Sequence, residues 1–314
     1  MRGMYRALSG SRHAEQAITE LAHRGTLPGH HSGLNHEAIG VGVGLALRPD
    51  DCAQMSHRSG TTLAHTRGGF TLRDAIRSRF GLAPSCHAAL PGRPRTLPIV
   101  GLVGTWVPMS VGVAMADKLR KKGTVTVTFF GDGAANEGAV HEAMNLAGAR
   151  RLPIVFLLEN NGMAVSLSSR ESSAAETLVS RAVGYGMPGT RVDGHDPLQV
   201  YGAAAEAVAK ARSGEGPSLI EAVVSRWEGH AVGIRDTRST AEVSLARSRD
   251  ALRETREQLL RDNVITAAEA DRVDAECRSE VALAIAECLR EPRGPLATAW
   301  AIDAAEAEAL TFSP

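Results

Sequence analysis

Short apolar runs alternate with amphipathic stretches along most of this chain. Residues 124–130 are mainly β-branched and aromatic, and residues 153–158 form a second apolar run, so both segments predict buried strands. Residues 189–195 and 217–226 predict two more strands, and helical patterns separate the segments. This alternation predicts an α/β fold, a doubly wound, mostly parallel sheet with helices on both faces. Ligands bind such sheets at the carboxyl ends of the strands.

The helical patterns place apolar residues at intervals of three and four. They predict helices at residues 4–24, 35–47, 71–80, 108–120, 168–187, 198–212, 240–261 and 267–289, and one that starts after residue 132. We divide the chain into an α/β domain at residues 1–238 and a C-terminal helical extension at 239–314. The extension is expected to pack on the same domain.

The 314 residues carry 35 basic and 35 acidic side chains, so the formal net charge is zero. A balanced charge gives no reason to expect nucleic acid or an anionic membrane as a partner. The N-terminus, Met-Arg-Gly-Met-Tyr-Arg, has no apolar core and indicates no signal peptide. No apolar run is long enough to span a bilayer. The four cysteines show neither a CxxC pair nor a metal-binding spacing, so we expect a cytoplasmic protein with reduced thiols.

The strand at 124–130 stops at Gly131-Asp132-Gly133, and a helical pattern starts directly after it. A helix N-terminus offers free N–H groups and a positive dipole end, which suit a phosphate group. Asp132 contributes a hard oxygen ligand of the kind that Mg²⁺ prefers. The next strand delivers Asn160 and Asn161 at its carboxyl end. Adjacent parallel strands would place Asp132 beside Asn161, where two oxygens could share one Mg²⁺ that carries a diphosphate.

The Gly-Asp-Gly turn and the Asn-Asn pair at this spacing resemble the motif that binds thiamine diphosphate. Residues 131–138 are similar to the α subunit of the decarboxylating component of 2-oxo acid dehydrogenase complexes. This family includes pyruvate, branched-chain 2-oxo acid and acetoin dehydrogenases, and the resemblance covers nearly all of the chain. It implies thiamine diphosphate and Mg²⁺ as cofactors. The alternative is a plain glycine turn and an Asn-Asn-Gly loop in some other α/β enzyme.

The resemblance also implies roles for single residues. Asp132, Asn161 and the carbonyl of Met163 would hold Mg²⁺, and His31 and His230 would act on the substrate. The residues implied for cofactor binding, besides the metal ligands and His230, are His57, Arg58, Gly101, Val103, Gly131, Gly133 and Ala134.

Two of these assignments rest on simple chemistry. The guanidinium of Arg58 would bind diphosphate oxygens in pairs, and backbone groups of Gly101 and Val103 would hold the aminopyrimidine ring. Alternatives remain at two places: a solvated loop histidine for His31, and a buried strand with a turn for residues 101–108.

The chain departs from the family at several positions. Gly60 stands where the family has a second histidine after the arginine, and His65 is the residue that could fill the gap from a shifted position. The Asn35-His36 pair replaces Gly-Gln. Only Ser85 and His87 survive of a Gly-Gly-Ser-x-His element. The substrate pocket is therefore nonstandard, and the resemblance does not name the substrate.

The resemblance also implies an assembly. The glutamate that serves the cofactor ring belongs to a β subunit in two-chain members, and this sequence has no second, pyrimidine-binding half. The implied enzyme is a heterotetramer of two α and two β subunits that decarboxylates a 2-oxo acid, or cleaves acetoin, and passes the acyl group to a lipoyl acyltransferase. Alanines at 135, 139, 143 and 147 give one helix a smooth face, which we expect at the subunit interface rather than in the core.

Two other hypotheses about the function stay open. One is a divergent two-chain thiamine diphosphate enzyme that transfers the acyl carbanion to a small-molecule acceptor, without a lipoyl partner. The altered pair at 35–36, Gly60 and the eroded element around Ser85 favour it. The other is a non-catalytic scaffold subunit. The intact Asp132, Asn161, Arg58 and His230 argue against it.

Overall fold

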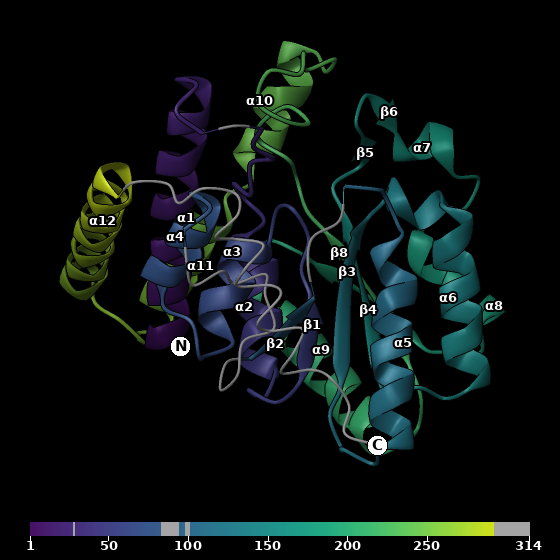
Figure 1. Ribbon diagram of the computed structural model, residues 1–314. Helices are drawn as coiled ribbons and strands as arrows, with labels where there is room; N and C mark the ends of the chain where they lie inside the picture. Colours follow the sequence, from purple (N-terminus) through teal and green to yellow (C-terminus); the bar gives the residue numbers. More distant parts are fainter. Residues whose placement is uncertain (28, 83–93, 98–100, 292–314) are drawn as a thin grey trace.

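A six-stranded parallel sheet forms the centre of the molecule in the computed structural model, which describes residues 1–27, 29–82, 94–97 and 101–291 (Figure 1). The strands lie in the order β2 (Arg95–Leu97), β1 (Cys52–Gln54), β3 (Thr126–Gly131), β4 (Ile154–Asn160), β8 (Ser218–Val223) and β7 (Gly189–Asp193). The predicted fold class, an α/β protein with a parallel sheet, is therefore confirmed.

Helices cover both faces of the sheet, and a further helical layer lies outside one of them (Figure 1). One face packs against α5 (Trp106–Leu119) and α6 (Gly138–Ala149). The other packs against α2 (Glu37–Ala46), α3 (Gly60–Thr66) and α9 (Pro197–Arg212). The outer layer comprises α1 (Arg2–His23), α4 (Leu72–Arg79), α11 (Ala251–Arg261) and α12 (Ala267–Arg290).

The central strands are apolar on both sides because both sides are covered. Phe129 packs with Val127 toward α2 and α9, whereas Phe130 points toward α5 and α6. Successive side chains of a strand face opposite ways, so a doubly covered parallel strand reads as a continuous apolar run. Within the described ranges, no helix combines the length and the apolar character needed to cross a bilayer.

The glycines of α2 allow this helix to pack closely against its neighbours. A Cβ on Gly42 would stand 2.7 Å from the Cβ of Val200 in α9, and one on Gly44 would stand 2.0 Å from Oγ1 of Thr66 in α3. The repeated glycines therefore serve helix packing.

Residues 168–187 do not form the single helix that the pattern predicts. The strand β6 (Leu167–Ser168) leads into two four-residue helices, α7 (Ser169–Ser172) and α8 (Arg181–Gly184), with the 3-10 turn η2 (Leu178–Ser180) before the second. Ser173, after α7, has extended backbone angles. Serine and threonine side chains bond to nearby backbone groups and so compete with a long helix.

Residues 240–261 are likewise broken into two helices. The first is α10 (Thr240–Ser248), and α11 follows after Arg249, which has extended backbone angles. The carboxylate of Asp250 accepts the N–H groups of Leu252 and Arg253 and so starts the second helix as its N-cap. The division of the chain at residue 238 stays a prediction, although α11 and α12 do pack on α1.

Three of the four alanines of the α6 face belong to the core of this chain, so the subunit interface expected along them is wrong; the fourth, Ala139, is half-buried. Ala135, Ala143 and Ala147 are buried within the single chain, in the cluster that joins α5, α6 and the sheet. The small side chains let α5 and α6 approach each other on the sheet. The fourfold spacing indicated a close helix neighbour correctly, but it could not tell an internal neighbour from a partner.

Candidate functional site

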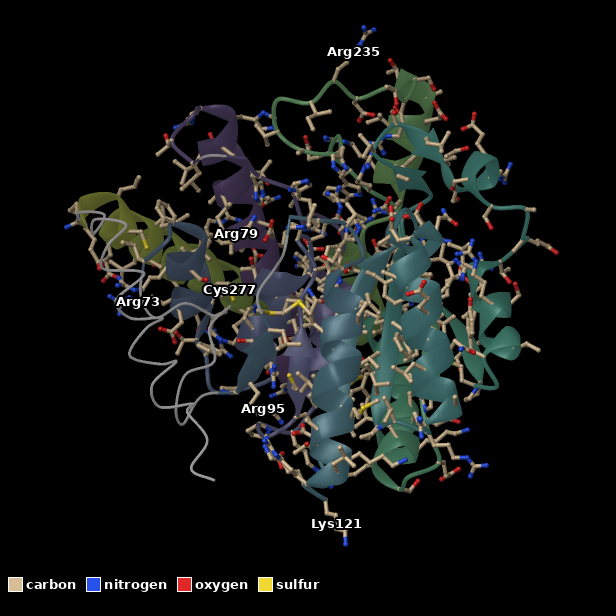
Figure 2. All side chains as sticks on the ribbon, turned by 45° about the vertical axis from the view of Figure 1, so that its right-hand side comes forward. Arg73, Arg79, Arg95, Lys121, Arg235 and Cys277 are labelled. Atoms are coloured by element: carbon tan, nitrogen blue, oxygen red, sulfur yellow. The ribbon has the colours of Figure 1, made fainter. Side chains whose placement is uncertain are left out.

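The carboxyl ends of β3, β4 and β8 meet at one end of the sheet. Lys121, which precedes β3, lies at one end of the molecule, and Arg235, in the loop after β8, lies at the opposite end (Figure 2). In the sheet Gly131 pairs with Glu159, so the loops after β3 and β4 leave the sheet side by side. The residues predicted to bind metal stand on these two loops.

Asp132 directly follows β3 and is almost fully buried, with 2% of its surface exposed. The backbone N–H of Asn161 donates to its carboxylate, so the structure brings these two predicted metal ligands together. Within the described residues, Oδ2 of Asp132 has no hydrogen-bond partner. Burial raises the pKa of this carboxyl, because the charged form loses its hydration. A bound cation would remove the cost of this unpaired oxygen.

Met163 lies beside the same turn. Its N–H donates to Oδ1 of Asn161 over 3.3 Å, and it begins the antiparallel hairpin of β5 (Met163–Ala164) and β6. The hairpin lies against the turn after β3, since a Cβ on Gly133 would stand 2.8 Å from that of Ala164. Gly131 ends β3, and Ala134 begins the 3-10 turn η1 (Ala134–Asn136).

The donors at this turn suit a hard cation. One carboxylate, one side-chain amide and one backbone carbonyl are ligands of the kind that Mg²⁺ accepts, with the ligand's own oxygens completing its shell. In the part of the chain that the structure describes, no three His, Cys, Asp or Glu side chains form a metal-binding group.

Three histidines from three separate loops face one another near this end of the sheet. The ring centroids of His31 and His57 lie 5.0 Å apart in a stacked arrangement, and His230 meets His31 edge-on at 4.8 Å. Trp106, at the start of α5, meets His57 edge-on at 6.1 Å. His31 is thus a member of a ring cluster and not a solvated loop histidine.

The histidine cluster is held in its neutral form. Burial lowers the pKa of His31 to about 3, with further lowering by His57 and Arg58. Burial is also the main reason why the pKa values of His57 and His230 are lowered. Neutral imidazoles have one N–H and one lone pair each, so each ring can donate one hydrogen bond and accept another.

Arg58 joins two of the loops that carry these histidines. Its Nη1 donates to the carbonyl of Ser32 and its Nη2 to the carbonyl of His230, each over 2.8 Å. Burial lowers its pKa to about 10. Sequence reasoning placed this guanidinium on a diphosphate, whereas in the structure two of its nitrogens hold the backbone beside His31 and at His230.

Arg226 is the residue that the sequence reasoning left out of the site. It is 2% exposed, and Nη2 donates to the carbonyl of Val165 over 3.3 Å, while Nε and Nη1 have no partner among the described residues. Burial and then Arg238 lower its pKa, and Asp236 and Asp132 act in the opposite sense. A buried guanidinium with two unpaired nitrogens is a site for an anion. A signal was available, because Arg226 lies close behind an apolar strand, near the carboxyl end of the sheet where ligands bind.

Gly101 and Val103 lie in an exposed turn before α5. A buried strand, the alternative considered for residues 101–108, is therefore excluded at these two residues. Val103 is 54% exposed. The turn leads directly into Trp106, whose ring contacts His57, so its backbone is placed beside the histidine cluster.

His65 does not replace the missing histidine at Gly60. Its ring bonds to Oγ of Ser11 in α1 over 2.8 Å, and burial lowers its pKa to about 4. No ring contact joins it to the histidine cluster within the described ranges. Ser85 and His87 lie outside the described residues.

Known proteins resemble this chain over most of its length. The family model for the dehydrogenase E1 component matches residues 5–296. The α subunit of acetoin:2,6-dichlorophenolindophenol oxidoreductase from Cupriavidus necator is 34% identical over 307 residues, which covers 93% of this chain and 90% of that protein. The α subunit of 2-oxoisovalerate dehydrogenase from Bacillus subtilis is 36% identical over 261 residues, covering 79% and 78%. The α subunit of the pyruvate dehydrogenase E1 component from Zymomonas mobilis is 32% identical over 289 residues, covering 88% and 80%.

Proposed function

This chain belongs to the dehydrogenase E1 component family, and on that premise we propose that it is the α subunit of a thiamine diphosphate-dependent enzyme acting on a 2-oxo acid or on acetoin. The family resemblance read from the sequence is confirmed by the family match. The observation that carries the proposal is that Asp132 and Arg226, both buried near the carboxyl ends of the strands, keep atoms without a hydrogen-bond partner among the described residues. One attracts a cation and the other an anion, and a metal-bound diphosphate presents both.

In this proposal the loops after β3 and β4 bind the metal. Asp132, Asn161 and the carbonyl of Met163 are the ligands of Mg²⁺ from this chain. Arg226 binds the diphosphate, and backbone groups of Gly101 and Val103 hold the aminopyrimidine ring. The buried, unpaired Oδ2 of Asp132 and the hairpin that lies on Gly133 support the metal assignment.

The three histidines are proposed to handle the substrate and its protons. Thiamine diphosphate, when bound, supplies a nucleophilic carbon and an electron sink. His31 and His230 would orient the 2-oxo acid by hydrogen bonds and move protons at the reacting atoms, and His57 stacks on His31 and fixes its ring plane. Their lowered pKa values support the hydrogen-bonding part of this role, since an uncharged imidazole offers the substrate one N–H donor and one lone pair.

We further propose that the chain works in a heterotetramer of two α and two β subunits. The relatives are named α subunits, which supports a two-chain enzyme. The β subunit would supply the carboxylate that serves the aminopyrimidine ring, and a lipoyl acyltransferase would receive the acyl group.

Transfer of the acyl group to a small carbonyl compound, without a lipoyl partner, is the second candidate. The observation in its favour is Gly60, which stands where the family has a histidine. His65 does not supply the missing imidazole, because its ring faces Ser11. A changed pocket at this point would change which acceptor the enzyme uses.

The test uses the chain assembled with its cognate β subunit. Calorimetric titration with Mg²⁺ and thiamine diphosphate should show binding, and pyruvate, 2-oxoisovalerate or acetoin should then reduce 2,6-dichlorophenolindophenol. A lipoyl domain and a free aldehyde, offered in parallel as acceptors, separate the two candidates. Failure of the assembled enzyme to bind the cofactor would refute the proposal and support a scaffold subunit.

A further inference from the structure

Asn35 connects two segments that are 190 residues apart. It is fully buried, and its φ of 72° lies in the left-handed region, which asparagine tolerates better than most residues. Its Nδ2 donates to the carbonyl of Ser225 over 3.1 Å and to Oγ of Ser225 over 2.9 Å. Its Oδ1 accepts the N–H of Ala251 at the start of α11 over 3.1 Å. The side chain thus fixes Ser225 against the loop that carries His31.

His195 holds the same serine from the other side. The N–H of Ser225 donates to Nε2 of His195 over 3.1 Å, and Nδ1 of His195 lies 2.8 Å from Oδ1 of Asp193. Because a backbone N–H can only donate, Nε2 is the acceptor and Nδ1 carries the proton. Arg249 in turn donates to Oδ2 of Asp193 over 2.7 Å.

Ser225, His195 and Asp193 follow the contact order of a hydrolytic triad, but the serine is not free to act as a nucleophile. Its Oγ lies 2.9 Å from Nε2 of His195, accepts Nδ2 of Asn35, and donates its single hydrogen to the carbonyl of Ala246 over 2.8 Å. In a triad the histidine takes the serine proton. Here the hydroxyl is fully engaged, so the arrangement is a clamp on the backbone.

Asn35 and His195 hold Ser225 just beyond the point where β8 stops pairing with its neighbouring strands. The last paired residue of β8 is Val223, and the N–H of Val224 still donates to the carbonyl of Asn160. Beyond this point, side chains hold Ser225, and Arg226 follows directly. The guanidinium of Arg226 donates only to Val165 among the described residues, over 3.3 Å, so its own contacts fix its direction weakly.

We propose that Asn35 and His195 are positioning residues that act through Ser225 to aim Arg226 at the diphosphate. This inference rests on the proposed function. Neither residue is proposed to touch the cofactor. Both set the backbone from which the buried guanidinium extends.

The test measures the affinity of the assembled enzyme for Mg²⁺ and thiamine diphosphate by calorimetry, together with kcat and KM for the 2-oxo acid at saturating cofactor. Asn35→Gly removes the three side-chain bonds and keeps the left-handed backbone free of strain. Asn263→Gly is the matched control, because Asn263 is exposed, has a φ of 54° and lies between α11 and α12. His195→Leu removes the acceptor for the N–H of Ser225, and His195→Gln restores an oxygen near that position.

Loss of two or three hydrogen bonds should raise the dissociation constant of the cofactor about tenfold in Asn35→Gly and in His195→Leu. The KM for the 2-oxo acid should stay unchanged, His195→Gln should recover most of the affinity, and Asn263→Gly should match the wild type. If Asn35→Gly fails to assemble, the two His195 variants decide the matter.

Wild-type cofactor affinity in His195→Leu, or equal losses in His195→Leu and His195→Gln, would overturn the inference. So would a loss of kcat with unchanged cofactor affinity, which indicates a merely structural role. If the wild-type enzyme itself does not bind the cofactor, the proposed function fails, and this outcome is distinct from a failure of the variants alone.

Discussion

Asp132→Asn should change the stability of the unliganded protein and its affinity for the cofactor in opposite directions. Asp132 is 2% exposed, and its Oδ2 is without a partner within the described residues. Its raised pKa shows that the surroundings disfavour the charged form. Asparagine has nearly the same shape and no charge, and its Oδ1 can still accept the N–H of Asn161.

The magnitude follows from the cost of one unsatisfied oxygen. A buried polar group without a partner costs about 1–3 kcal/mol. Part of this cost remains, because the new N–H₂ group also lacks an acceptor. The free energy of unfolding of the unliganded protein should therefore rise by about 1 kcal/mol, and the Tm by about 2 °C.

The affinity for Mg²⁺ and thiamine diphosphate should fall, and this effect should be larger than the gain in stability. The substitution removes the only carboxylate among the proposed Mg²⁺ ligands of this chain. Changing even the outer partners of a metal site weakens binding about 10- to 100-fold, so the dissociation constant for Mg²⁺ and thiamine diphosphate should rise at least about 100-fold.

Differential scanning calorimetry with and without cofactor measures both effects on the assembled enzyme. Wild type should gain Tm when cofactor is added, and Asp132→Asn should not. Asp50→Asn, which changes an exposed carboxyl in the loop before β1, is the control and should behave as wild type. A variant that is less stable without cofactor, yet still gains Tm with it, would refute the assignment of Asp132 to the metal.

Three further predictions concern other parts of the molecule. Arg226→Met should weaken cofactor binding about 10- to 100-fold in the same titration and leave the unliganded protein about as stable as before, since a buried charge with two unpaired nitrogens among the described residues is removed. His31 binds fewer protons in the folded than in the unfolded chain between its lowered pKa of about 3 and its ordinary value of 6.5. The free energy of unfolding should therefore fall as pH drops through this window, and His31→Asn should flatten that slope in urea titrations at several pH values. Ala143→Leu should cost about 1–3 kcal/mol by overpacking the space between α5 and α6, with no change in the assembly seen by light scattering.

Strand and turn chemistry near the site could be predicted from the sequence, because it depends on neighbours in the chain. The β-branched run before Gly131 and the apolar run before Asn160 became β3 and β4, which pair in parallel. Because neighbouring parallel strands end at the same edge of the sheet, this pairing alone predicts that Asp132 lies beside Asn161, as the structure shows.

The state of the charged groups could not be predicted in this way. Arg58 was expected on a diphosphate because its residue type suits one, yet two of its nitrogens are engaged by the carbonyls of Ser32 and His230. Arg226 was overlooked, although two nitrogens of its buried guanidinium have no partner among the described residues. Which guanidinium is free depends on carbonyls brought in by distant loops.

The sequence alone predicted the α/β fold class, the acidic turn at Asp132 and the family to which the chain belongs. These features follow from local periodicity and from short motifs. Only the tertiary structure decided that the alanine face of α6 is internal, that His65 faces Ser11, and that Asn35 holds Ser225 from 190 residues away. Such contacts join residues far apart in the chain, and close packing of whole layers, not local preference, selects them.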